Sequence, residues 1–240
     1  MKSLTRKGEV AEAVNRCIDV YSRQGLDACI SETNEQLLNV KIKFPLFEFA
    51  GFQFFEKINF REHILFCQKI AELKTIGGNV LIGIILQNRL PDHLPECYEK
   101  AAEYIIIGDE WYVCDIIGER VFGYSLLTQA DKSLPWYHQF STHENKWVVR
   151  ALGAGGHYAI KKGLDKNSAR QLFQLLLSLA NVRDQQVRQG IGWAAKTTAK
   201  FHPDIIATFK AEIADETKVA NWFRRKVDIG LSRNKYAQGN

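Results

Sequence analysis

The sequence predicts an all-α protein, an α-solenoid of about eleven short helices that stack as helical hairpins. Two observations favour this fold class. Apolar residues recur at helical spacing in nearly every segment, and no segment has a convincing partner strand. Helices of this length, each with one apolar face, must bury that face against their neighbours, and an array of hairpins is the simplest way to do so. A length of 240 residues suits one such domain.

In the first part of the chain, three segments are predicted to be helices: 9–23, 45–58 and 61–74. Pro45 fits the first turn of its helix, because the N–H that proline lacks has no helical partner there. Residues 40–44 alternate like a strand, but we interpret them as an extended linker before Pro45. Residues 78–87 are ambiguous, since their valine and isoleucines suit a strand for which no partner is evident.

The rest of the chain is helical in pattern, over the segments 95–106, 110–122, 145–161, 168–180, 184–200, 204–213 and 217–231. Brief connections between helices make neighbours in sequence pack against each other. We therefore expect a single domain over residues 1–240, with residues 235–240 as a flexible tail.

Composition indicates a globular chain whose basic residues are concentrated in the second half. Hydrophobic residues make up 46% and charged residues 25%, which excludes a disordered or fibrous protein. Residues 1–120 carry 14 Lys and Arg against 18 Asp and Glu, whereas residues 121–240 carry 18 against 9. A basic half is typical of a surface for a polyanion, most often nucleic acid, although a solvated basic face gives the same composition.

The five cysteines indicate free thiols in a reducing compartment. Their number is odd and no pair is spaced Cys-x-x-Cys, so neither a disulfide framework nor a zinc site is expected. Residues 1–25 lack an apolar signal core, and the longest apolar stretch, residues 80–86, is too short to span a bilayer. We expect a soluble cytoplasmic protein with access to DNA and no membrane partner.

Trp111 and Asp115 are the first candidates for chemistry. They are four residues apart and share one face of the helix predicted over residues 110–122. A carboxylate beside an indole can serve a reacting centre that becomes positive. The alternative is a core tryptophan followed by an exposed aspartate.

Arg150 is the second candidate, because it lies in the otherwise apolar helical segment 146–151. Arginine suits bidentate contact with a phosphate, and the alternative is an arginine that bridges two helices. Residues 153–156, Gly-Ala-Gly-Gly, lack the third glycine and the preceding strand of a dinucleotide site. They predict instead a close approach of two helices, or of a helix and a DNA backbone.

A third group forms a stripe on one helix. Gln189, Trp193, Lys196 and Lys200 follow one another at steps of four, three and four, and Arg188 adds a further charge. Basic groups interleaved with an aromatic ring suit a phosphate backbone with a stacking contact beside it. Lysines that extend past a tryptophan at the edge of the core would give the same pattern.

Together these groups resemble the AlkD-type DNA alkylation repair family, the HEAT-like-repeat alkylpurine DNA glycosylases. The likeness lies in the order, type and spacing of four residues. Trp111 and Asp115 stand four apart, Arg150 follows after 35 residues, and Trp193 follows after 43 more.

Two segments extend this likeness. Residues 147–151 resemble the family's arginine-bearing helix, and residues 190–204 resemble the helix that carries its second active-site tryptophan. The resemblance covers roughly residues 100–230. It implies a curved α-solenoid of HEAT-like helical hairpins whose basic concave face holds duplex DNA.

The resemblance also implies an activity: hydrolysis of the N-glycosidic bond of cationic N3- and N7-alkylated purines, such as 3-methyladenine and 7-methylguanine. Asp115 would stabilise the sugar cation, Trp111 and Trp193 would press on the sugar, and Arg150 would grip a phosphate. Further DNA contacts are implied for Gln189, Arg188, Lys196, Lys200 and Trp147. No metal cluster or cofactor loop is apparent, this chemistry needs neither, and nothing demands more than a monomer.

Two other functions remain open at this stage. One is a non-catalytic α-solenoid that binds branched or distorted DNA, or a protein partner, and the other is a solenoid directed to RNA. A binder has no need of the Asp115 carboxylate, because a carboxylate repels phosphates.

Overall fold

The computed structural model describes residues 3–234, which are helical almost throughout. The architecture is an all-α helical-repeat solenoid, as the sequence predicts. The polypeptide chain divides into two compact units, Met1–Ile117 and Gly118–Asn240. The flexible tail expected at residues 235–240 lies outside the described residues, and the single domain over the whole chain stays a prediction.

The first unit is a series of packed helices. Its elements are β1 (Ser3–Leu4), α1 (Lys7–Gln24), α2 (Leu26–Thr33), a π-helical turn (Asn34–Leu38), β2 (Lys41–Ile42), α3 (Phe44–Lys57), a 3-10 turn (Phe60–Glu62), α4 (His63–Glu72) and α5 (Ile76–Gly108). Helices α1, α3 and α5 pack in succession, while α2 packs on α1 and α4 packs on α5. Pro45 lies in the first turn of α3, as predicted.

Several segments of this unit differ from the sequence prediction. Helix α2 and the π-helical turn that follows it were not predicted. Residues 40–44 are not only a linker, because Lys41–Ile42 pairs in parallel with Ser3–Leu4. The partner strand lies far away in the sequence, so local alternation could not identify it. Residues 78–87 are helical, and nearly every side chain from Gly77 to Leu86 is buried. Their apolar composition therefore reflects a helix enclosed on all sides rather than a strand.

Helix α5 is bent at His93, whose φ of −131° and ψ of 38° are not helical. Pro91 and Pro95 flank the bend, and each proline removes a helical N–H donor. This bend separates the segments 78–87 and 95–106 that the sequence predicts as distinct.

Asp109 sets the start of the next helix. It ends α5 in the left-handed conformation, with φ 49° and ψ 36°, and its N–H donates to the Ile105 carbonyl. Helix α6 (Trp111–Gly118) follows and continues through the π-helical turn η3 (Glu119–Gly123) into α7 (Tyr124–Thr128). π-helical turns are rare and often lie at functional segments.

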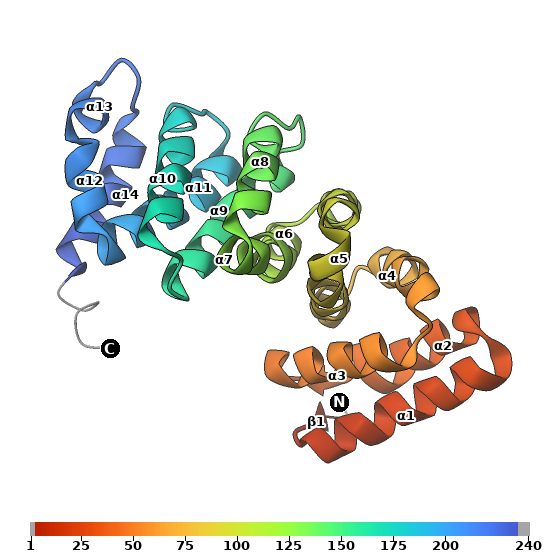
Figure 1. Cartoon of the computed structure of the whole chain (residues 1–240). Coiled ribbons are helices and arrows are strands. Elements are labelled where there is room, and N and C mark those ends of the chain that lie inside the picture. Colours follow the sequence, from red (N-terminus) through yellow and green to blue (C-terminus); the bar gives the residue numbers. More distant parts are fainter. Residues whose placement is uncertain (1–2, 235–240) are drawn as a thin grey trace. The chain divides into compact units, whose positions relative to one another are not determined.

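The second unit repeats a hairpin pattern. Beyond α7 its helices are α8 (Ala130–Phe140), α9 (Lys146–Lys161), α10 (Lys166–Ser178), α11 (Gln185–Phe201), α12 (Pro203–Thr208), α13 (Lys210–Ala214) and α14 (Asn221–Ser232). The turn η3 and the helices α9, α11 and α14 pack in succession, with α8 and α10 on α9 and α12 on α11. Figure 1 labels the α-helices of this series. Helix α8, with Pro135 inside it, was not predicted.

Glycines let α9 and α11 cross with their backbones in contact. A Cβ on Gly153 would lie 2.1 Å from the Gly190 carbonyl, and one on Gly190 would lie 2.4 Å from the Arg150 carbonyl oxygen. Gly155 makes a similar approach to Gly123, where a Cβ would lie 2.8 Å from the backbone nitrogen. The glycine-rich segment therefore brings helices together, the first of the two alternatives in the sequence.

All five cysteines are buried as thiols and take part in no disulfide among the described residues. Over the described residues, no helix combines the length and the apolar character that crossing a bilayer requires.

Candidate functional site

Trp111 and Asp115 lie one turn apart on α6. The Trp111 side chain is 53% exposed and meets the Tyr112 ring edge to face, with 5.8 Å between ring centroids. Asp115 is half-buried, and its Oδ1 lies 3.7 Å from the Cys114 thiol sulfur. The alternative of a core tryptophan beside an exposed aspartate is therefore wrong. An exposed indole and a half-buried carboxylate therefore lie one helical turn apart on α6.

Arg150 is buried in the contact between α9 and α11, with 6% of its surface exposed. Its Nη1 donates to Gln186 Oε1 at 2.9 Å and to Gln189 Oε1 at 3.1 Å. Two amide oxygens of α11 thus accept hydrogen bonds from one guanidinium nitrogen. Arg150 thus bridges two helices, and the same two bonds hold its planar head in one orientation.

Trp193 lies on the same face of α11, one turn after Gln189, and is half-buried. Its indole stacks on the imidazole of His157 from α9, with ring centroids 4.0 Å apart and planes at 22°. Thr197, one turn further along α11, bonds to His157 Nδ1 at 2.7 Å. The contact between α9 and α11 therefore positions both Arg150 and Trp193.

A cluster of like charges surrounds Lys196. The pKa of Lys196 is lowered from its usual value by burial, and further by the positive charges of Lys226 and Arg233. Lys226 runs its aliphatic stem across Gly192, where a Cβ would lie 3.0 Å from Lys226 Cγ. Within residues 3–234, none of these three cations forms an ion pair with an acidic side chain. An anion placed among them would relieve their mutual repulsion.

The remaining basic candidates contact aromatic rings. The Lys200 ammonium lies 4.9 Å from the centre of the Phe201 ring, and the Arg188 guanidinium lies 5.4 Å from that of Trp222. Both side chains are half-buried. Trp147 differs from the expectation of a DNA contact, because only 6% of it is exposed. A buried ring offers no face to a duplex, and we do not include it in the site.

The predicted site residues fall into two groups. Trp111 and Asp115 belong to the first unit, while Arg150, Gln189, Trp193 and the lysines belong to the second. Convergence of the two groups on one groove stays a prediction.

Three residues of the second group were missed in the sequence. Gln186 binds Arg150, and His157 with Thr197 lies against Trp193. A signal existed, because His157 follows Arg150 by seven residues, two helical turns, and therefore lies on the same face. Periodicity alone could not say which helix that face meets.

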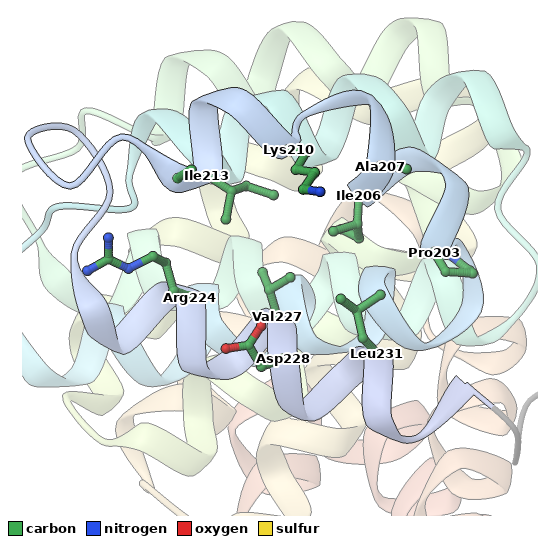
Figure 2. A pocket seen from close by; sticks show the side chains of 10 residues that line it. Pro203, Ile206, Ala207, Lys210, Ile213, Arg224, Val227, Asp228 and Leu231 are labelled. Carbon is green, nitrogen blue, oxygen red and sulfur yellow. The ribbon is translucent and has the colours of Figure 1, made fainter.

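A pocket of about 480 Å³ lies elsewhere, between α12, α13 and α14 (Figure 2). Ile206, Ile213, Val227 and Leu231 make it apolar, and Lys210, Arg224 and Asp228 also line it. It contains none of the predicted site residues. This pocket is therefore separate from the predicted site.

Comparison with known families decides the assignment. Residues 62–226 match the family model described as DNA alkylation repair enzyme. The chain belongs to this family. Every predicted site residue of this DNA alkylation repair protein, from Trp111 to Lys200, lies inside the match, and residues 1–61 lie outside it. Comparisons with curated proteins and with solved structures find no match.

Proposed function

We propose that this member of the DNA alkylation repair family is a DNA glycosylase. Its substrates would be cationic N3- and N7-alkylated purines in duplex DNA, whose N-glycosidic bond it would hydrolyse. The observation that carries the proposal is Asp115, a half-buried carboxylate one turn from the exposed indole of Trp111, within the region that matches the family.

The charge of the substrate explains why one carboxylate would suffice. A purine alkylated at N3 or N7 is positively charged and leaves without being protonated. Glycosidases that act on neutral leaving groups need a second carboxyl group as general acid. Here the carboxylate has one task, which is to stabilise the positive charge that develops on the deoxyribose and to orient the attacking water.

The two tryptophans would act on the same cation. An indole face is negative at its centre and attracts a positive group placed over it. Trp111 has more than half of its surface available, and Trp193 is held in position by its stack on His157. We propose that both rings press on the sugar next to the lesion.

Phosphate binding would come from the second unit. Gln189, Arg188, Lys196 and Lys200 lie on α11, and Arg150, which is as buried as Trp147, would contribute by holding the Gln189 amide from α9. The Lys196 cluster with Lys226 and Arg233 supports this role, because its cations lack acidic partners within the described chain. Such contacts fix the register of the duplex and carry no sequence information.

The proposal is tested by incubating the protein with duplex DNA that contains one 7-methylguanine. We expect free 7-methylguanine and an abasic site, detected by chromatography and by cleavage of the strand in alkali. The same reactions are assayed for binding. A stable complex that releases no base would make the protein a DNA binder and would overturn the proposal.

Lys196→Gln is expected to weaken binding of duplex DNA equally for all sequences. The slope of log affinity against log salt concentration should fall by about one, the value for one lost phosphate contact. Lys132→Gln, an equal change of charge on an exposed residue of α8, serves as the control and should leave the slope unchanged. Equal slopes for wild type and Lys196→Gln would remove Lys196 from the interface.

A further inference from the structure

His157 occupies the space behind Trp193. The two rings are stacked at 4.0 Å between centroids with 22° between their planes, so the imidazole covers one face of the indole. Both residues are half-buried. A flat ring in van der Waals contact with a second flat ring restricts its tilt, and Trp193 therefore depends on His157 for its orientation.

Hydrogen bonds fix the imidazole in turn. The Thr197 hydroxyl donates its one proton to the Trp193 carbonyl oxygen at 2.9 Å. The Thr197 oxygen must then accept from His157 Nδ1, which lies 2.7 Å away. This assignment puts a proton on Nδ1 and leaves Nε2 without one in the neutral ring. A chain of two hydrogen bonds thus links the ring of His157 through the Thr197 hydroxyl to the backbone of Trp193, the residue on whose indole the imidazole stacks.

The surroundings keep His157 uncharged. Burial lowers the pKa of His157 to about 4, and the positive charges of Lys161 on α9 and Lys196 on α11 contribute to the shift. An imidazolium in this position would be a cation on the indole's negative face. The imidazolium would then interact with the π system of Trp193, which we propose attracts the sugar cation. A neutral ring supports the indole without competing with the substrate.

We infer that His157 is a positioning residue, a neutral platform that holds the Trp193 indole in the orientation needed against the deoxyribose. Its catalytic meaning rests on the proposed glycosylase function. The stacking of His157 on Trp193 and the charge state of His157 do not depend on that function, so both can be tested in the free protein.

The catalytic test measures single-turnover release of 7-methylguanine by His157→Ala, by His157→Phe and by His157→Ala combined with Trp193→Ala. His157→Ala should lower the rate at least tenfold, because a small loss of alignment is enough to do so, while duplex affinity changes less than twofold. His157→Phe keeps a flat neutral ring and should restore most of the rate. In a Trp193→Ala background, His157→Ala should add no further loss.

Three results would overturn the inference. One is an equal loss from His157→Ala with and without the indole of Trp193. Another is failure of His157→Phe to recover activity although it folds. The third is a loss as large in His138→Ala, the control on the exposed histidine of α8.

A measurement that needs no activity separates this inference from the proposed function. Nuclear magnetic resonance of the free protein should show the His157 ring titrating below pH 5, with the Trp193 indole N–H shifting at the same midpoint. An ordinary midpoint near 6.5, or no response of the indole, would refute the platform even if bases are released. The expected titration without base release would leave the platform in place and refute the glycosylase.

Discussion

Replacing Asp115 with asparagine is expected to slow base release about 100- to 1000-fold, the usual effect of removing one group that stabilises transition-state charge. Asparagine has nearly the same shape as aspartate but carries no negative charge. Affinity for the duplex should stay equal or rise, because a carboxylate repels phosphates. The effect should therefore appear in the single-turnover rate and not in the dissociation constant.

Asp131→Asn is the matched control for this change. Asp131 is exposed on α8, and its replacement alters the net charge by the same amount. We expect the control to release 7-methylguanine at the wild-type rate. If Asp115→Asn and Asp131→Asn were equally active, the carboxylate on α6 would have no part in the reaction.

Gly190→Ala is expected to destabilise the protein by about 3 kcal/mol, at the upper end of the usual cost of overpacking a core. The added Cβ would lie 2.4 Å from the Arg150 carbonyl oxygen, and backbone atoms cannot turn aside as a side chain can. Helices α9 and α11 would have to separate. Urea denaturation measures the loss as a lower midpoint at an unchanged slope.

Gly192→Ala, two residues along the same helix, provides the control. The atoms nearest to its Cβ would be those of the flexible Lys226 side chain, with Cγ at 3.0 Å. Alanine is the better helix former by about 1 kcal/mol, so stability should be unchanged or higher. Equal destabilisation by both substitutions would mean that the close crossing of α9 and α11 at Gly190 does not determine the effect.

Much of this fold could be predicted from helical periodicity, because the buried face of a helix appears in the sequence as apolar residues spaced three and four apart. The pattern failed where that signal was weak or absent. Helix α8 contains Pro135, and the pairing of Lys41–Ile42 with Ser3–Leu4 joins residues far apart in the chain. Residues 78–87 were ambiguous because a fully buried helix has no polar face to reveal its period.

The candidate site was predictable to the same extent. Trp111 and Asp115 share a face because they are four apart on one helix, which the sequence shows directly. The partners of Arg150 and Trp193 lie 36 to 39 residues away on another helix. Which faces of α9 and α11 meet depends on the glycines at their crossing, and spacing along one helix holds no information about that.

The central claim is that a single carboxylate serves a substrate whose base already carries positive charge. Release of 7-methylguanine should therefore be compared with release of 7-methyl-7-deazaguanine, an uncharged base of the same shape, from otherwise identical duplexes. We predict that the protein binds both duplexes with similar affinity and releases only the cationic base. Release of both bases at comparable rates, or of neither from a stable complex, would contradict the account.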